Sequence, residues 1–224
     1  MTELLAQHAR RVVAIEIDAR LLPRLHQVAA RLGNVSVVAG DVLALDLTEL
    51  AAGERFRIYG NLPYYITSPI VHRLLEHSDR LDAAFLVMQM EVAERLAAEP
   101  GHREYAYLSA IVQFYARVEV MLRIPPGAFR PPPKVASALV ALRTPGEGPA
   151  LGITNERGFG EFLKRCFAQK RKMLRNNLRA LVDGQSVEEI FREAGIGPNA
   201  RAEELTLAQF ARLFELTATQ RRGV

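Results

Sequence analysis

The strongest constraint on the fold is a regular alternation of short apolar runs with longer helical patterns in the first two thirds of the chain. The short runs predict strands over Val12–Ile17, Val35–Val38, Phe56–Tyr59, Ala83–Met88 and Val118–Leu122. Between them, apolar residues recur at helical spacing over Leu21–Leu32, Pro69–Leu75 and Glu91–Ala98. This alternation is typical of a parallel, doubly wound α/β sheet, which binds ligands beyond the carboxyl ends of its strands.

The last third of the chain has a different character. A proline-rich segment, Ile124–Val135, leads into a last expected strand over Val135–Leu142. Glycine and proline sustain neither periodicity in Pro145–Gly152, which we interpret as a linker. Beyond it, the pattern is helical over Phe159–Leu181, Val187–Ala194 and Leu207–Leu216. We therefore predict an α/β domain over residues 1–143 and a small all-helical domain over residues 153–224.

Length and composition define the class of protein. The 224 residues are 49% hydrophobic, which is enough for a packed core. The single cysteine, Cys166, excludes an internal disulfide and a cysteine zinc cluster, so we expect a buried side chain and no metal. No run approaches the roughly 18 apolar residues of a membrane helix. Met1–Arg11 lacks the pattern of a signal peptide, and we expect a cytoplasmic protein.

The string NLPY, residues 61–64, follows the expected strand Phe56–Tyr59 and Gly60. Asn61 presents an amide oxygen there, Pro63 stiffens the turn, and Tyr64 presents a flat face. A flipped-out purine could donate its exocyclic amine hydrogens to the Asn61 side chain and the Leu62 carbonyl while it stacks on Tyr64. Holding both hydrogens directs the nitrogen lone pair at an electrophile without a metal or a strong base. By itself, the string is equally compatible with a packed turn.

Further motifs accompany this string. VVAIEID contains Glu16, AGDVL contains Asp41, and FRPPPKVAS, FAQKRKMLRNNL and RAE begin at Phe129, Phe167 and Arg201. Together with NLPYY, they resemble the ribosomal RNA adenine dimethyltransferases, which modify an adenine pair near the end of small-subunit ribosomal RNA. The resemblance covers essentially the whole chain. It implies a Rossmann-like methyltransferase sheet that uses S-adenosylmethionine, followed by a helical domain that positions RNA.

The resemblance also implies how the cofactor would be held. Glu16, with Ile17 beside it, would bind the ribose hydroxyls of S-adenosylmethionine. Asp41 would accept from the adenine amine of the cofactor, with Val42 beside it, and Asn61 would contact the cofactor as well as the target. Two alternatives stay open: an acid after a parallel strand is also typical of a nicotinamide dinucleotide site, and Asp41 could cap the next helix.

In the proline-rich loop, the resemblance implies that Phe129 covers the face of the target base opposite Tyr64. Lys134 in the same loop is a candidate contact for RNA. The alternatives are that the prolines form only a rigid linker and that Phe129 packs in the core.

Residues 164–179 contain seven basic residues and no acidic one. On one continuous helix, at about 100° per residue, six of these cations would share an arc of roughly 120°. Solvated charged faces usually mix signs, whereas a stripe without acids suits RNA phosphates. The predicted RNA-binding residues are therefore Lys134, Lys164, Arg165, Arg171, Lys172, Arg175 and Arg179.

Part of the family pattern is missing at the start of the sequence. In such a sheet, a first strand and a glycine-rich turn precede the acid that binds the ribose, but Met1–Leu5 looks like the helix after that turn. We expect the strands Val12–Ile17 and Phe56–Tyr59 each to have an unpaired edge, and the chain alone to be poorly stable or inactive. Met90 and Ala106 replace a lysine and a glycine of the usual pattern.

The sequence thus predicts an adenine-N6 dimethyltransferase that transfers methyl groups from S-adenosylmethionine to small-subunit (16S) ribosomal RNA. We expect it to act as a monomer on the immature small ribosomal subunit, with no membrane partner. One alternative is a methyltransferase for large-subunit RNA, although the extended FRPPPKV and FAQKRK motifs favour the small subunit. Another is an RNA-binding or ribosome-assembly protein without catalysis.

Overall fold

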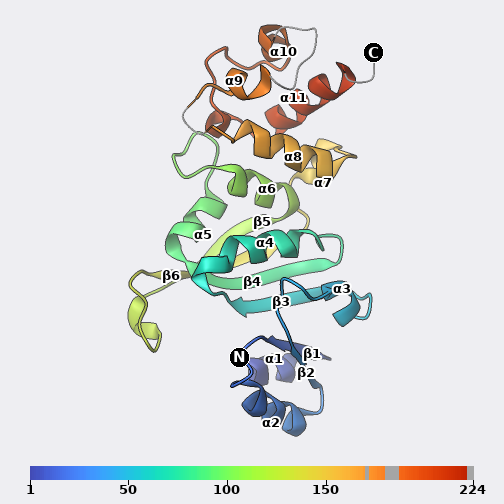
Figure 1. Ribbon diagram of the computed structural model, residues 1–224, viewed down its shortest axis with the longest axis vertical. Coiled ribbons are helices and arrows are strands. Elements are labelled where there is room, and N and C mark those ends of the chain that lie inside the picture. The colour runs from blue at the N-terminus through green and yellow to red at the C-terminus, as the bar shows by residue number, and fades with distance from the viewer. Residues whose placement is uncertain (170–171, 180–186, 221–224) are drawn as a thin grey trace. The chain divides into compact units, whose positions relative to one another are not determined.

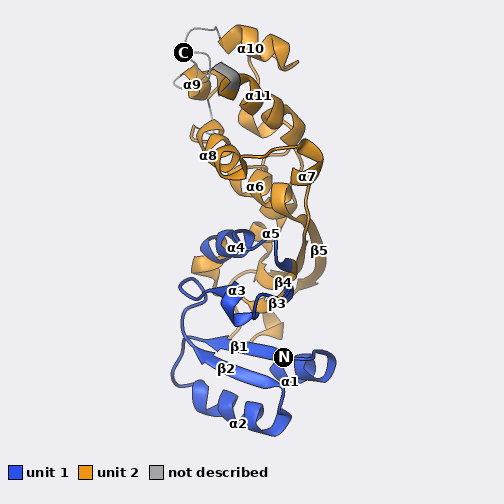
Figure 2. Cartoon of the chain, turned by 90° about the vertical axis from the view of Figure 1, so that its right-hand side faces the viewer, with its two compact units in different colours: residues 1–56, 69–81 blue, residues 57–68, 82–224 orange. Residues whose placement is uncertain are grey.

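The computed structural model of the chain describes residues 1–169, 172–179 and 187–220 (Figure 1). The chain forms two compact units, which Figure 2 colours separately. Unit 1 consists of Met1–Phe56 and Pro69–Leu81, and unit 2 consists of Arg57–Ser68 and Asp82–Val224. The chain therefore passes from unit 1 to unit 2, returns to unit 1, and then ends in unit 2.

Unit 1 is built around a pair of parallel strands. Its elements are α1 (Thr2–His8), β1 (Val12–Glu16), α2 (Leu22–Leu32), β2 (Val35–Ala39), α3 (Leu47–Leu50) and most of α4 (Thr67–Leu75). β1 and β2 are parallel, with Glu16 opposite Ala39. α2 joins them and ends at Gly33, whose positive φ of 69° is one that glycine adopts without steric cost. The carboxyl ends of both strands therefore lie at one edge of the pair.

Unit 2 contains a four-stranded mixed sheet. Its strands are β3 (Phe56–Asn61), β4 (Leu81–Gln89), β5 (Arg117–Ile124) and β6 (Ser137–Arg143), in the spatial order β3-β4-β6-β5. β6 is antiparallel to both neighbours, so the expectation of a parallel sheet is wrong there. The cause is the connection from β5 to β6, a loop with one 3-10 turn, η2 (Pro126–Ala128), in place of the crossover helix that parallel strands usually need.

The helices of unit 2 share a core with this sheet. They are α5 (Met90–Ala97), α6 (Tyr107–Tyr115), α7 (Gly148–Leu151), α8 (Glu156–Cys166), α9 (Leu174–Leu178), α10 (Val187–Glu193) and α11 (Leu207–Gln220). α5 and α6 pack on the sheet, and α8 packs on α6. The Phe159 ring of α8 lies 5.0 Å from Phe114 of α6 and 5.5 Å from Phe214 of α11. The buried rings of Phe114 and Phe159 and the half-buried ring of Phe214 thus join the helical end of the chain to the sheet layer.

The strands expected from the sequence are all present, with bounds that differ by a few residues. The three helices expected between the strands correspond to α2, α4 and α5. The pattern did not predict α6, because its residues from Leu108 to Val112 are all buried and leave no amphipathic stripe.

The interpretation of Pro145–Gly152 as a linker is wrong, because this segment packs tightly on α6. Gly146 N donates to Tyr115 O over 2.9 Å, and Glu147 N donates to Gln113 O over 3.0 Å. A Cβ at Gly146 would lie 2.3 Å from Gln113 O, so only glycine allows this approach. Gly146 and Gly148 thus serve close packing, whereas Gly152 ends α7 in a left-handed backbone conformation.

The single helix expected over Phe159–Leu181 is also wrong, because α8 ends at Cys166 and α9 begins at Leu174. Leu181 lies outside the described residues. The Asn177 side chain donates to Cys166 O over 2.7 Å and so satisfies a carbonyl at the end of α8. The basic residues of this segment therefore do not lie on one continuous helix.

Two expectations about the edges of the sheet and the core hold in the part of the chain that the structure describes. β1 has β2 as its only strand neighbour, and β3 has only β4, so each has an unpaired edge. Cys166 is fully buried, and burial raises the pKa of its thiol. The expected domain boundary between residues 143 and 153 stays a prediction. None of the described helices is long and apolar enough to cross a membrane.

Candidate active site and nucleic-acid interface

Residues 61–64 form a turn that is anchored to the sheet of unit 2. Asn61 is the last residue of β3, and Tyr64 begins a 3-10 turn, η1 (Tyr64–Ile66). Leu62 is buried, and its N–H donates to Val87 O of β4 over 2.9 Å. This bond fixes the backbone of the turn, whereas the Asn61 side chain is exposed at the end of the strand.

The turn leaves two acceptors without partners. Pro63 O is occupied, because it accepts from Ile66 N and Thr67 Oγ1 at 3.2 Å each. The Asn61 side chain and the Leu62 carbonyl form no hydrogen bond with any described residue. These two oxygens therefore remain available to a ligand that carries an amine.

Tyr64 is half-buried and is held by β6. Its hydroxyl forms a hydrogen bond of 2.7 Å with Ser137 Oγ. Ser137 is fully buried at the start of β6, where the proline-rich loop ends. The sequence did not single out Ser137, since its only signal was its position in the motif FRPPPKVAS. The hydrogen bond connects the NLPY turn to that motif.

The loop of residues 125–136 projects from the sheet between β5 and β6 (Figure 1). Phe129 in this loop is half-buried and is not part of the buried core. Neither Phe129 nor Tyr64 contacts another aromatic ring among the described residues. Lys134 is exposed in the same loop. The loop thus offers an aromatic ring and a cation to a ligand.

Two carboxylates from unit 1 lie at the carboxyl edge of the β1–β2 pair. Glu16 ends β1, and Asp41 lies two residues beyond the end of β2. Glu16 Oε1 accepts from Asp18 N over 2.8 Å, and Asp41 Oδ1 accepts from Leu43 N over 2.9 Å. Each carboxylate keeps acceptor capacity, since neither forms an ion pair with a described residue. Ile17 is exposed and Val42 is half-buried beside them.

The neighbouring carboxylates are already bound by the protein. Hydrogen bonds from Arg20 lower the pKa of Asp18 to about 2. Asp46 accepts from two backbone amides at the start of α3, which lowers its pKa. Asp46, and not Asp41, is therefore the cap of that helix. Among the described residues, Glu16 and Asp41 are left available at this edge, and their role as ligand residues stays a prediction.

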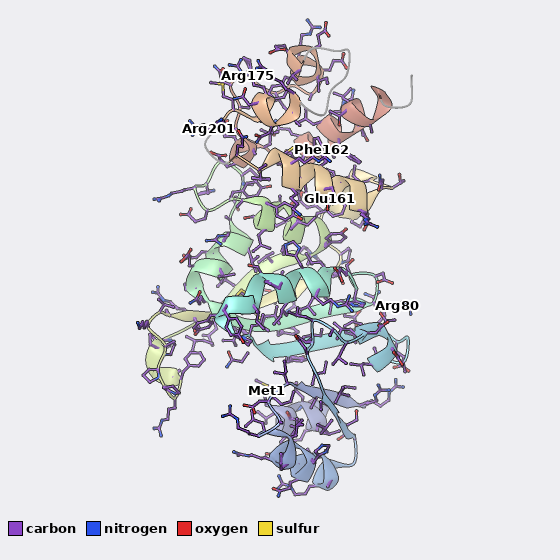
Figure 3. The ribbon with its side chains drawn as sticks, in the orientation of Figure 1. Met1, Arg80, Glu161, Phe162, Arg175 and Arg201 are labelled. Atoms are coloured by element: carbon purple, nitrogen blue, oxygen red, sulfur yellow. The ribbon has the colours of Figure 1, made fainter. Side chains whose placement is uncertain are left out.

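The described basic residues of segment 164–179 form no ion pair with an acidic residue in the described part of the chain. Lys164 and Arg165 are exposed in the last turn of α8, and Lys172 and Arg179 are exposed beside α9. Arg175 of α9, labelled in Figure 3, is half-buried, and its Nε has no hydrogen-bond partner among the described residues. The predicted contact Arg171 lies outside the described residues. The prediction of one shared helical face is wrong, but the described cations are unpaired.

Comparison with known sequences identifies relatives over nearly the whole chain. The sequence profile of the family described as "Ribosomal RNA adenine dimethylase" matches residues 1–219. The "Ribosomal RNA small subunit methyltransferase A" of Acidobacterium capsulatum is 45% identical over 96% of this chain and 76% of its own length. The protein of that name from Koribacter versatilis is 41% identical over 96% of this chain and 79% of its length.

Solved structures agree with these relatives. A dimethyladenosine transferase from Plasmodium falciparum has a TM-score of 0.83 at 26% identity and covers 98% of this chain and 86% of its own. The 23S rRNA methyltransferase ErmE has a TM-score of 0.73 at 28% identity over 97% of this chain and 86% of its own. These likenesses confirm the Rossmann-like methyltransferase fold with its helical C-terminal region. As its motifs indicated, the chain belongs to the ribosomal RNA adenine dimethylase family.

Proposed function

We propose that the chain acts as an adenine-N6 dimethyltransferase that transfers methyl groups from S-adenosylmethionine to small-subunit ribosomal RNA. The observation that carries this proposal is the NLPY turn. Its backbone is bound to the sheet, yet the Asn61 side chain and the Leu62 carbonyl have no partner among the described residues. Acceptors that lack partners but stand on a fixed backbone suit an amine that must be oriented before it reacts.

Within the turn, Asn61 and Leu62 orient the target. The adenine amine donates one hydrogen to the Asn61 side-chain oxygen and the other to the Leu62 carbonyl. S-adenosylmethionine supplies an electrophilic methyl group when bound. As the new nitrogen–carbon bond forms, the sulfur–carbon bond breaks, the sulfur keeps its electron pair, and the amine releases one proton to solvent. The residues act by position, so no general base is needed.

Two rings hold the flipped base. Tyr64 stacks on one face, Phe129 covers the other, and Pro63 keeps the turn rigid. Support comes from the absence of any aromatic partner for either ring among the described residues. Stacking of this kind tolerates any base, so the choice of adenine falls to the two acceptors that bind its amine.

Unit 1 contributes the cofactor ligands. Glu16 accepts from the ribose hydroxyls of S-adenosylmethionine, and Asp41 accepts from its adenine amine, with Ile17 and Val42 beside them. The carboxylates fit these donors because they come from neighbouring parallel strands and have no ion-pair partner among the described residues. The family resemblance also implies that Asn61 contacts the cofactor as well as the target. Membership of a methyltransferase family favours this cofactor over a nicotinamide dinucleotide.

The cations Lys134, Lys164, Arg165, Lys172 and Arg179 bind RNA phosphates, together with Arg175 and the undescribed Arg171. Such contacts set affinity and placement rather than the choice of base. The natural substrate is the immature small ribosomal subunit, on which the protein acts as a monomer in the cytoplasm. Relatives named for the small subunit, 45% and 41% identical over 96% of this chain, favour this substrate.

The test is transfer of labelled methyl groups from S-adenosylmethionine to unmethylated small ribosomal subunits. On this proposal, and against the expectation of an inactive chain drawn from its first residues, we expect label in N6-methylated adenines of the small subunit, none in large subunits, and none with Asn61→Ala. Label in large subunits alone would overturn the substrate. Label that persists in Asn61→Ala would overturn the mechanism.

A second candidate function, RNA binding without methyl transfer, is favoured by the unpaired cations among the described residues of segment 164–179, which require no cofactor. Binding to small subunits that is as tight without S-adenosylmethionine as with it, and no transfer of label, would establish this alternative.

A further inference from the structure

We propose that Ser137 is a positioning residue for methyl transfer, because its hydroxyl fixes the Tyr64 ring on which the target base stacks. This inference rests on the proposed function of the NLPY turn and extends it to a residue 73 positions further along the chain. Ser137 acts through Tyr64 and does not itself touch the substrate.

Burial makes the hydrogen bond between Ser137 and Tyr64 obligatory. Ser137 is 0% exposed, and Tyr64 is its only side-chain partner among the described residues. A buried hydroxyl without a partner loses its hydration and gains nothing in return, so the folded chain favours the 2.7 Å contact. The tyrosine ring is thereby held at its far end.

The serine itself stands on rigid backbone. It is the first residue of β6 and is paired between Gln89 of β4 and Ile124 of β5. The preceding carbonyl, Ala136 O, accepts from Met90 N over 2.9 Å. Only one torsion angle, χ1, places the oxygen of a serine side chain, so on such a strand the oxygen has little freedom to move.

The NLPY turn is consequently attached to the sheet at two points. Leu62 N is bound to β4 through Val87 O, and the Tyr64 hydroxyl is bound to β6 through Ser137. The amine acceptors lie at the first attachment, and the stacking ring ends at the second. A base that donates to these acceptors and stacks on this ring is therefore held at its amine and also across its face.

The adjacent Tyr65 provides an internal comparison. It has the same side chain as Tyr64, but it is 86% exposed and has no hydrogen-bond partner among the described residues. Of two consecutive tyrosines, only the one at the end of the NLPY motif is bound to a strand. Tyr65→Phe is thus a matched control for Tyr64→Phe, since each change removes one hydroxyl and keeps the ring.

The loss of this bond should slow transfer more than it weakens binding, because phosphate contacts dominate RNA affinity. Removal of one neutral hydrogen bond implies a fall in the single-turnover rate of about 5- to 10-fold. We expect this fall in Ser137→Ala and in Tyr64→Phe, and no further fall in the double variant. Ser137→Thr, which keeps the hydroxyl, should restore most of the rate.

The experiment measures single-turnover methyl transfer, the Kd for small subunits and the thermal unfolding midpoint for the full chain and each variant. Ser109→Ala is the stability control, because Ser109 is equally buried and donates to Arg95 O, outside the proposed site. It should lower the unfolding midpoint without slowing transfer. A second readout is the emission of 2-aminopurine in place of the target adenine, which should be less quenched by stacking in Ser137→Ala.

The outcomes separate this inference from the proposed function. If the unchanged chain transfers no methyl group to RNA, the proposed function fails. If it does transfer methyl groups, but Tyr64→Phe keeps the full rate or the two losses add in the double variant, the inference alone is overturned. A rate loss in Ser137→Ala that Tyr65→Phe or Ser109→Ala reproduces would also overturn it, as a general effect on the fold.

Discussion

The turn at residues 61–64 and the basic segment at residues 164–179 both belong to unit 2, but they differ in how many of their polar groups the protein itself uses. In the turn, Leu62 N, Pro63 O and the Tyr64 hydroxyl are all bound. The Asn61 side-chain oxygen and the Leu62 carbonyl have no partner among the described residues. In the basic segment, the described cations have no ion pair. Fixed groups suit a reaction that needs orientation, whereas exposed unpaired charges suit the capture of an anion.

The arginines of unit 1 sharpen this comparison. Arg20 and Arg31 are paired with Asp18 and Glu3, each at 2.6 Å, and Arg10 is paired with Glu54. The net charge of +4 does not distinguish such paired cations from those of the basic segment. What matters for RNA is which charges lack a partner, so substitutions in the three regions should affect different measured quantities.

The largest effect is expected at Asn61. Asn61→Ala removes one of the two free acceptors, and the single-turnover rate should fall by about 100- to 1000-fold, as on loss of a group that positions reacting atoms. The Kd for small subunits should stay close to that of the unchanged chain. Rate and affinity are measured in parallel, with the exposed Asn199→Ala as control. A weaker Kd with an unchanged rate would reverse the assignment of chemistry to the turn and binding to the cations.

The next effect concerns the cofactor carboxylates. Glu16→Gln and Asp41→Asn should each weaken S-adenosylmethionine binding by about 10- to 100-fold, since a hydrogen bond to a charged group is worth more than a neutral one. Isothermal titration calorimetry measures this. Asp18→Asn is the matched control, because Asp18 is already bound by Arg20. Equal losses of affinity in all three variants would contradict the assignment of cofactor binding to the two carboxylates that have no ion-pair partner.

Much of the architecture could be predicted, because periodicity reports which face of a segment is buried. The strands of both units and the acids at the ends of β1 and β2 follow from such patterns, since parallel strands bring their carboxyl ends to one edge. α6 could not be predicted in this way, because it is buried on almost all sides. The direction of β6 depends on a loop whose prolines indicate rigidity but not the direction of the returning strand.

The least predictable features are contacts between residues that are distant in sequence. At the break between α8 and α9, the Asn177 side chain donates to Cys166 O, whereas helical periodicity in the sequence continues across the break. The bond from Tyr64 to Ser137 joins two motifs that each suggested a role of its own. Sequence motifs thus located the candidate groups, whereas only the fold reveals which of them the protein already uses.

A smaller effect is expected from the unpaired cations. The triple substitution of Lys164, Arg165 and Lys172 by Gln should reduce the salt dependence of RNA binding by about 0.7 to 0.9 for each phosphate that the protein no longer neutralises. The rate at saturating RNA should stay unchanged. Substitution of Arg10, Arg20 and Arg31 by Gln removes the same charge from paired sites and should change the salt dependence less. Equal slopes for the two triple variants would show that net charge, not unpaired charge, governs binding.

The smallest effect should come from Asn177, which holds the break within the basic segment. Asn177→Ala removes the bond to Cys166 O and should lower the free energy of unfolding by about 0.5 to 1.5 kcal/mol. The neighbouring Asn176 is exposed, and its side chain has no partner among the described residues, so Asn176→Ala should leave stability almost unchanged. Denaturant titration measures both. Because Asn177 carries no charge, a change in RNA affinity in Asn177→Ala alone would mean that the placement of the cations matters as well as their number. Equal stability of the two variants would instead mean that other contacts end α8 and that the basic segment does not depend on this bond.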